Sequence, residues 1–431
     1  MTTMAQHPTS DTTIFLDQPP SCLQFHPSSR NHFLVGTYLL SEHKEDDSAP
    51  IQQTKTGSLQ LWHLDPATNQ LTLRHKHPLP FAVFDLHFHP TDPTLAAIAT
   101  SAASVVFFRI TPDFDAGEDV SSCIKEIHSH QVHEDPSIPA LYLAWLPAGW
   151  HSTTTSTSTT NPEGETEYGF AVTFSDGLTT IFNTNLSSLP NSFSIAEESS
   201  YPATQQIEVW FVAAATYPPP QSDGDKMRYI FTGSDFGSLH TRYLPAPCKR
   251  TNSEDEDEAQ ASTPILSHDD RARHHTAGVT AILPLPVPMT DGAPWLLTGS
   301  YDESLRVYHA SRRGEVLGEI GLGGGVWRLQ ILSTQSRTLN GEEGVKEWEF
   351  LVLASCMHAG TRVVKVRVVG GESGELKECE MEVLAEFTEH QSMNYASDVW
   401  NLGGNHGEGR ELVVVSSSFY DRRVCVWRVN V

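Results

Sequence analysis

The sequence predicts an all-β chain folded as a closed seven-bladed β-propeller. The first observation is a short strand that alternates apolar and other residues and ends on a bulky side chain. It occurs seven times, as LQLW (59–62), VVFF (105–108), TTIF (179–182), SLHT (238–241), LRVY (305–308), TRVV (361–364) and VCVW (424–427). Strands that recur along a chain in this way are typical of propellers, whose blades are small antiparallel sheets.

The second observation is that an opening strand precedes each closing strand. The seven openers are CLQFHP (22–27), FDLHFHP (84–90), YLAWLP (142–147), IEVWFV (207–212), VTAILPLP (279–286), GVWRLQIL (325–332) and SDVWNLGG (397–404). Apolar residues alternate with others in these segments, and Pro or Gly often ends the strand. Seven openers therefore match seven closers, and further apolar strands such as WLLTGS (295–300) lie between them.

The third observation concerns the two ends of the chain. The last segment ends on an inner strand, so no sequence remains for the outer strand of the seventh blade. TTIFLD (12–17) precedes the first opener and has the alternation of a strand. We expect it to complete the last blade and to lock the ring, because a closed ring leaves no long sheet edge exposed.

We assign the whole chain, 1–431, to one propeller domain. The predicted blades cover residues 21–77, 78–131, 132–200, 201–270, 271–322, 323–389, and 390–431 together with 12–17. The intervals exceed the about 40 to 45 residues of a plain WD-type blade, so insertions are expected. Polar stretches near 41–56, 151–167, 246–273 and 333–347 are predicted to be disordered loops.

Composition excludes several classes of partner and cofactor. The formal net charge is −25, so we expect neither nucleic acid nor an anionic membrane as a partner. No C-x-x-C pair or clustered His accompanies the six cysteines, so we predict no metal and no cofactor. The N-terminus does not resemble a secretory signal, and no apolar run is long enough to span a membrane. We therefore predict a cytoplasmic monomer.

Four loops of the last two blades should meet on one face. In a four-stranded meander, the loop that enters a blade and the turn between its second and third strands open on the same side. For blades six and seven these are LGGGVW (322–327), TEHQSMNYASDVW (388–400), SCMHAG (355–360) and SSFYDRR (417–423). They bring together the densest set of reactive groups in the chain: Cys356, His358, His390, Ser392, Tyr395, Asp398, Tyr420 and Asp421.

These residues carry a resemblance to a known family. GGGVWR (323–328), CMH (356–358), SFYD (418–421) and the spaced residues of the loop 388–400 resemble the WD-repeat diphthine methyl ester hydrolases of diphthamide biosynthesis. The resemblance implies hydrolysis of a methyl ester on the modified histidine of translation elongation factor 2, which would be the partner. That side chain would also carry a trimethylammonium group, and quaternary ammonium is recognised by aromatic rings.

The implied esterase needs a nucleophile, a base and donors for the oxyanion. We take His390 as the base, with Asp398 or Asp421 orienting it, and His358 and Cys356 as further catalytic candidates. Water, Cys356 and Ser392 remain open as the nucleophile. The predicted substrate-binding residues include backbone donors around Gly324 and aromatic walls: Gly323, Gly324, Gly325, Trp327, Arg328, Ser392, Tyr395, Phe419 and Tyr420, with Trp400 as a further candidate wall.

Each candidate also has a structural interpretation. His390 stands at the blade entry, like His275, where a histidine commonly ties a blade together. Asp421 shares its place before the closing strand with Asp176, Asp235 and Asp302, where a carboxylate holds the turn. Cys356 suits a small buried position, because unreactive thiols are common in protein cores. The competing hypothesis is accordingly a propeller scaffold without catalysis that binds protein partners.

Overall fold

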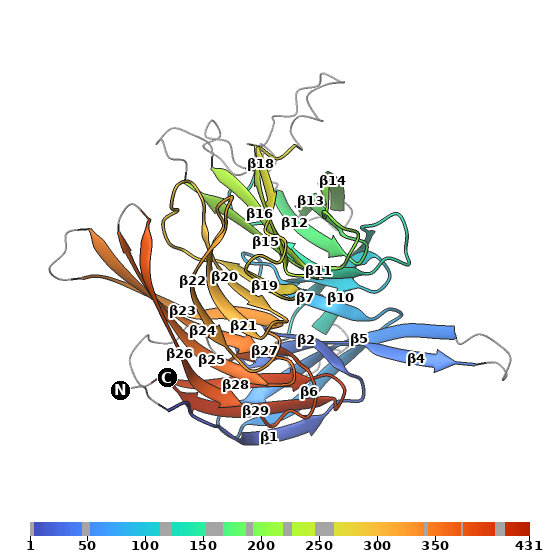
Figure 1. The fold of residues 1–431 in the computed structure, drawn as a ribbon. Helices are drawn as coiled ribbons and strands as arrows, with labels where there is room; N and C mark the ends of the chain where they lie inside the picture. The colour runs from blue at the N-terminus through green and yellow to red at the C-terminus, as the bar shows by residue number, and fades with distance from the viewer. Residues whose placement is uncertain are drawn as a thin grey trace, which may run out of the picture.

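The described part of the chain forms seven antiparallel sheets arranged as a ring (Figure 1). The computed structural model describes residues 4–44, 52–112, 123–151, 167–186, 193–218, 226–245, 263–339, 344–371, 374–400 and 410–431. The innermost strands contact one another in order, from β2 (Pro20–Phe25) through β7 (Val83–Phe88), β11 (Ala140–Trp145), β15 (Val209–Tyr217), β19 (Val279–Pro284), β23 (Arg328–Thr338) and β27 (Asn394–Val399) back to β2. The seven-bladed propeller is confirmed.

The remaining strands build outward from this inner ring. Blades one to three add β3 (His32–Thr37), β4 (Leu39–His43), β5 (Gln52–Asp65), β6 (Gln70–Leu79), β8 (Leu95–Thr100), β9 (Ser104–Ile110), β10 (Ile124–Gln131), β12 (Glu167–Phe174), β13 (Leu178–Leu186) and β14 (Phe193–Pro202). Blades four and five add β16 (Met227–Ser234), β17 (Ser238–Leu244), β18 (Leu266–Asp269), β20 (Trp295–Ser300), β21 (Ser304–His309) and β22 (Glu315–Gly321). Blades six and seven add β24 (Val345–Ser355), β25 (Thr361–Gly371), β26 (Leu376–Phe387), β28 (Glu411–Ser418), β29 (Arg423–Asn430) and the N-terminal β1 (Ser10–Phe15).

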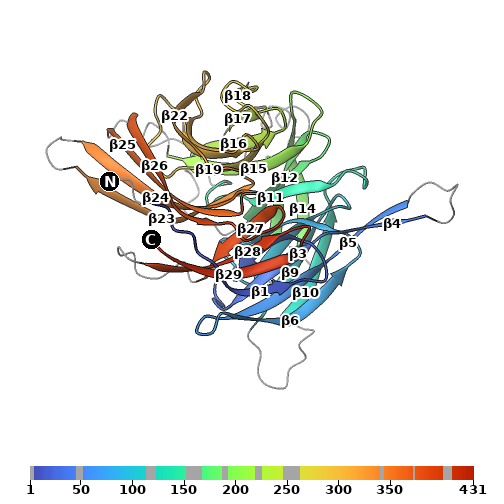
Figure 2. The same cartoon turned by 60° about the horizontal axis from the view of Figure 1, so that its bottom comes forward.

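The N-terminal strand closes the ring as predicted. β1 pairs antiparallel with β29 and so becomes the fourth strand of the last blade (Figure 2). The preceding segment adds to blade six, where the Gln6 amide donates to the Leu384 carbonyl at 2.8 Å. The Glu386 amide donates to the Gln6 carbonyl at the same distance. One N-terminal segment therefore holds the outer edges of blades six and seven.

Three of the expected disordered insertions contain strands. β4 and the first part of β5 form a hairpin that projects from blade one (Figure 1). β18 falls within 246–273, and the ends of 333–347 continue β23 and β24 as a paired extension of blade six. The prediction of loops was wrong for these residues, because polar strands can extend a sheet by backbone pairing alone. Most of the remaining insertion residues, including nearly all of 151–167, lie outside the described residues.

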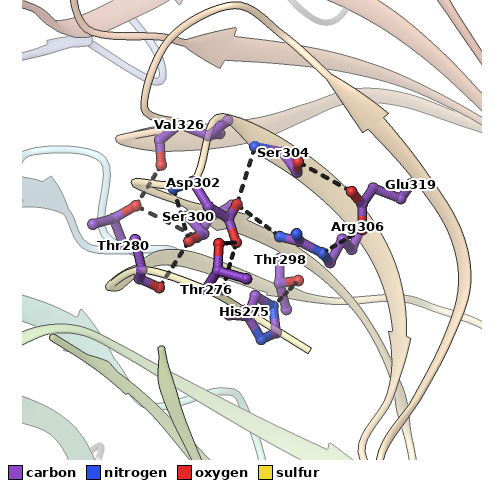
Figure 3. Close-up of polar contacts among 12 residues, drawn as sticks. His275, Thr276, Thr280, Thr298, Ser300, Asp302, Ser304, Arg306, Glu319 and Val326 are labelled. Atoms are coloured by element: carbon purple, nitrogen blue, oxygen red, sulfur yellow. Dashed lines mark hydrogen bonds and ion pairs between the residues drawn. The ribbon is translucent and has the colours of Figure 1, made fainter. Parts of the chain in front are cut away.

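Blade five shows how polar side chains hold a blade together (Figure 3). Asp302 accepts hydrogen bonds from the amides of Thr276 at 2.9 Å and Ser304 at 3.2 Å. Arg306 donates to the same carboxylate at 2.8 Å and to Glu319 at 2.8 Å. The His275 ring nitrogen Nε2 lies 2.8 Å from Thr298 Oγ1. A histidine at the blade entry and a carboxylate in the turn therefore fasten the entry loop to the inner strands.

A β-bulge near the start of most blades redirects the side chain of one residue in the innermost strand. The pairing of the first two strands skips one residue in blades one to five and in blade seven, for example between Val83 and Asp85 and between Val209 and Phe211. A bulge leaves the extra residue unpaired and bends the strand, which redirects its side chain. The skipped residues include Phe84, Trp210 and Tyr395. The bulges therefore turn three aromatic side chains out of the regular ladder at the same end of their blades.

No described segment forms a helix long and apolar enough to cross a membrane.

Candidate functional site

A continuous series of aromatic rings runs over the face on which the blade-entry loops open. We call Trp210, Tyr301, Trp327, Tyr395, Phe419, Tyr420, Tyr38 and Phe84 the aromatic belt. Trp327 lies at its centre, with ring centroids 5.6 Å from Trp210, 5.9 Å from Tyr301 and 5.0 Å from Tyr395. The series continues from Tyr395 to Phe419 at 5.6 Å and from Phe419 to Tyr420 at 5.0 Å. Tyr38 then joins Phe419 at 5.9 Å to Phe84 at 5.4 Å. Six blades therefore contribute to one aromatic surface.

Half of the belt was foreseen from the sequence. Trp327, Tyr395, Phe419 and Tyr420 were predicted as substrate-binding residues, and the structure brings their rings into contact. Four rings were missed: Tyr38, Phe84, Trp210 and Tyr301. Phe84 and Trp210 occupy the same bulge position as Tyr395. An alignment of the seven opening strands on that residue would have found them.

Carboxylates stand at one end of the belt. Asp235 accepts a hydrogen bond from the Trp210 indole at 2.7 Å, and it therefore differs from Asp302, which binds the turn. Burial raises the pKa of Asp235 despite that hydrogen bond, and the neighbouring Glu208 charge raises it further. Burial also raises the pKa of Tyr301 above its ordinary value, with Asp235 and Tyr395 adding to the effect. This end of the belt combines aromatic faces with negative charge, which is the environment that a cation prefers.

Ser392 and Asp421 hold the turn that presents Phe419 and Tyr420. Ser392 donates through Oγ to Asp421 at 2.9 Å and accepts from the Tyr420 amide at 2.9 Å. Asp421 also accepts from the Gln391 amide at 3.1 Å and from the Ser418 hydroxyl. Burial raises the pKa of Asp421, but these hydrogen bonds outweigh it and lower the pKa overall. Both side chains are engaged in shaping the belt.

His390 takes the position that His275 takes in blade five. Its Nε2 lies 2.8 Å from Ser416 Oγ, which also accepts from the Trp427 indole at 3.1 Å. Its ring also packs edge-on against Phe387. The side chain is buried, and burial lowers the pKa of His390 to about 4. The ring is therefore neutral near pH 7 and is held inside the blade.

Buried histidines make the stability of the fold sensitive to acid. Burial lowers the pKa of His89 and His390 to about 4 and that of His275 to about 3. An unfolded chain protonates these rings below about 6.5, whereas the folded chain does not until much lower pH. We therefore expect the free energy of unfolding to fall as the pH decreases from about 6.5 to about 4. Each of these histidines contributes up to about 1.4 kcal/mol for each pH unit.

Urea unfolding at several pH values between about 7.5 and 4.5 measures this slope. His390→Gln should reduce it, because one titrating group is lost. An unfolding free energy that stays constant across this range would contradict the expectation.

The glycine turn and the Cys356 turn pack directly against each other. A Cβ atom at Gly324 would lie 2.3 Å from the Cys356 carbonyl oxygen, and one at Gly325 would lie 2.8 Å from the Met357 sulfur. Only glycine permits this approach. Cys356 is fully buried, and burial raises the pKa of its thiol to about 12. His358, in the same turn, is exposed.

The structure separates Asp398 from His390. Asp398 accepts from the Phe25 amide at 2.7 Å, from Gln330 at 3.0 Å and from the Val399 amide at 2.7 Å. Its carboxylate therefore ties blades six, seven and one together, and burial raises its pKa. The geometry does not match the expectation that Asp398 orients His390. Trp400 is likewise outside the belt, since its indole donates to Asn31 at 2.9 Å.

A central cavity of about 300 Å³ lies within the ring of inner strands. Tyr395 of the belt and Asp398 contribute to its wall, together with Asp85, His87 and Arg328. The Arg328 guanidinium carbon stands 4.7 Å from the ring centroids of both Trp327 and Tyr142. Arg328 therefore connects the belt with the cavity. Within the described ranges, no cluster of three His, Cys, Asp or Glu side chains could hold a metal ion.

Fold and face together define the class: a WD-type seven-bladed propeller with an aromatic face over a central cavity lined by apolar and charged side chains. No protein-family model matches the sequence. The diphthine methyltransferase of Schizosaccharomyces pombe is 30% identical over 153 residues, which cover 36% of this chain and 38% of that protein. The chain is thus a distant homologue of that enzyme. The matched segment spans little more than a third of either protein.

Two solved propellers share the fold over nearly the whole chain. The crystal structure of Saccharomyces cerevisiae Sqt1 superposes with a TM-score of 0.51 at 11% identity, covering 99% of this chain and 100% of that one. Chaetomium thermophilum Sqt1, bound to the N-terminus of ribosomal protein L10, superposes with a TM-score of 0.50 at 14% identity, covering 98% and 100%. At such identities the likeness concerns the fold alone.

Proposed function

We propose that the protein hydrolyses the methyl ester of methylated diphthine on translation elongation factor 2. The observation that carries the proposal is the aromatic belt, in which Trp327 touches three other aromatic rings beside the Asp235 carboxylate. A trimethylammonium group cannot donate hydrogen bonds, so aromatic faces and negative charge are the means to recognise it. The distant homology to a diphthine methyltransferase supports the same substrate.

The net charge agrees with a cationic ligand. The chain carries 53 Asp and Glu against 28 Lys and Arg. Such an excess attracts a cationic side chain and repels phosphate backbones. In the proposal, the aromatic belt holds the quaternary ammonium group, and Tyr420, which is 69% exposed, forms its outermost wall.

Water is the attacking nucleophile in this proposal. The Cys356 thiol is buried with a raised pKa, so little thiolate exists near neutral pH. The Ser392 hydroxyl is engaged by Asp421 and by the Tyr420 amide. Asp421, to which Ser392 donates, has a lowered pKa and is therefore a weak base. The Cys356 thiol donates to the Ala354 carbonyl. The contacts at Gly324 and Gly325 explain by close packing why these positions are glycine.

Incubation with the methylated intermediate of elongation factor 2 tests the proposal. Mass spectrometry of the modified histidine should show the loss of one CH₂ group, and heavy-oxygen water should place its label in the new carboxylate. The same factor without the ester serves as the control and should keep its mass. A folded protein that leaves the ester intact would favour a scaffold without catalysis.

A further inference from the structure

A carboxylate–histidine pair lies in the central cavity and has no part in the site predicted from the sequence. Asp85 is buried on β7, and its Oδ2 lies 2.9 Å from His87 Nε2 on the same strand. The Leu143 amide donates to the same carboxylate oxygen at 3.1 Å. His87 lines the cavity, and its side chain is 30% exposed. The two groups are at ion-pair distance, and a carboxylate beside one nitrogen of a solvent-accessible imidazole is an arrangement found with general bases.

His87 departs from the structural pattern of its ring position. It is the penultimate residue of its inner strand, as Gln24 is in β2 and Asp398 is in β27. Gln24 accepts from the Phe88 amide at 2.9 Å, and Asp398 accepts from the Phe25 amide at 2.7 Å, so both fasten the next blade. The His87 ring instead faces Asp85 on its own strand. The ring also packs edge-on against Tyr142 of blade three, with a centroid distance of 5.3 Å. Unlike Gln24 and Asp398, His87 therefore contacts the next blade through an aromatic ring and not by accepting a strand-end amide.

Arg328 reaches the same pair from the other side of the ring. It begins β23 in blade six, and its Nη2 lies 3.8 Å from Asp85 Oδ1 in blade two. Its Nη1 donates to the carbonyls of Trp327 at 3.0 Å and Thr280 at 3.3 Å. The guanidinium also lies over the Tyr142 and Trp327 rings, so its position is well determined. A fixed cation thus stands between the aromatic belt and the Asp85–His87 pair.

We propose that His87 is the general base of the ester hydrolysis, that Asp85 positions it, and that Arg328 faces the developing oxyanion. This inference rests on the function proposed above. With the ammonium group in the belt, the ester would enter the cavity beside Arg328. His87 takes a proton from water through Nδ1 while the water oxygen bonds to the ester carbon. The tetrahedral intermediate then breaks its bond to the methoxy oxygen, which receives the proton from His87. The products are methanol and a carboxylate, with one proton released to solvent.

The charges in the cavity favour this role. Burial alone would raise the pKa of Asp85, but His87, Arg328 and the Leu143 amide outweigh burial and lower it. Asp85 is therefore an anion near neutral pH and can stabilise the imidazolium that forms on His87. The titratable and charged groups that line the cavity with His87 are Asp85 on β7, Cys22 on β2, Tyr142 on β11, Arg328 on β23, and Tyr395 and Asp398 on β27.

Steady-state kinetics of ester hydrolysis as a function of pH test the inference. His87→Gln should lower kcat by about 100-fold or more with little change in KM, because general-base catalysis contributes about 10² to 10⁴ in rate. The variant should also lose the acidic limb of the wild-type profile, where kcat falls as the base becomes protonated. In His87→Gly, added imidazole should restore part of the rate. Asp85→Asn and Arg328→Gln should lower kcat in the same assay, and thermal unfolding checks that each variant is folded.

His77→Gln is the matched control, because His77 lies on the outer strand β6, away from the cavity. It should keep both the rate and the pH profile. If wild type hydrolyses the ester and His87→Gln does so at the same rate and with the same profile, the role of His87 is refuted while the function stands. If wild type does not hydrolyse the ester at all, the function and the role of His87 are both refuted.

Discussion

Deletion of residues 1–16 is expected to prevent formation of a stable closed propeller. The deletion removes β1 and so leaves β29 as an unpaired edge. It also removes Gln6, which pairs with β26, and Leu16, whose side chain is buried in the core. At about 0.5 to 1.5 kcal/mol for each lost hydrogen bond, the total loss is on the order of several kcal/mol, which is comparable to the whole stability of many domains.

Circular dichroism during heating and size-exclusion chromatography measure this effect. Deletion of residues 1–3 alone, which keeps Gln6 and β1, should melt like the full chain. A synthetic peptide of residues 4–17 added to the longer deletion should raise its melting temperature, since a strand can be supplied to an open sheet edge from outside. The deletion of residues 1–16 melting at the temperature of the full chain would show that closure does not stabilise the ring.

Replacement of Trp327 by alanine is expected to raise KM for methylated elongation factor 2 by about 10-fold. Trp327 touches three rings of the belt, and its removal opens the centre of that surface. A cation over a Trp ring gains about 0.5 to 2 kcal/mol, and 1.4 kcal/mol corresponds to tenfold in affinity. Trp327→Phe keeps an aromatic face and should retain most of the affinity, whereas Trp327→Leu, apolar but not aromatic, should not.

Phe15→Ala is the matched control for the belt. Phe15 is also an exposed aromatic residue, at 65%, but it lies on β1 and outside the belt. Its loss should leave KM unchanged. A neutral analogue of the substrate, with a tert-butyl group in place of trimethylammonium, should bind wild type and Trp327→Ala with similar affinity. Equal losses for the cationic and neutral ligands would indicate that Trp327 contributes shape alone.

The architecture was predictable because each blade repeats the same local pattern. Alternating apolar residues, a bulky strand end and a stopping Pro or Gly are properties of short segments, and they recur in most blades. The insertions were mispredicted for the converse reason. Residues such as Ser333–Thr338 have no apolar face, and they form a strand because the partner strand Val345–Ser355 offers its backbone.

The face on which the predicted residues meet could be inferred from the sequence. The contacts of the individual side chains on that face could not. Strand order alone predicts which loops share a face, and the structure brings Trp327, Tyr395, Phe419 and Tyr420 together there. Strand order does not predict which polar atoms are already satisfied. His390 and Asp398 look reactive in sequence, but Ser416 engages the first and two backbone amides and Gln330 engage the second.

The sequence by itself determined the seven blades, the closing N-terminal strand and the face on which the last two blades present their loops. These follow from periodicities within a few residues and from counting strands. Only the tertiary structure decided that Asp85, His87 and Arg328 share one cavity, and that Trp210 and Tyr301 extend the belt. The ring closes on itself and so brings blades two and six, remote in the chain, to opposite walls of one central space.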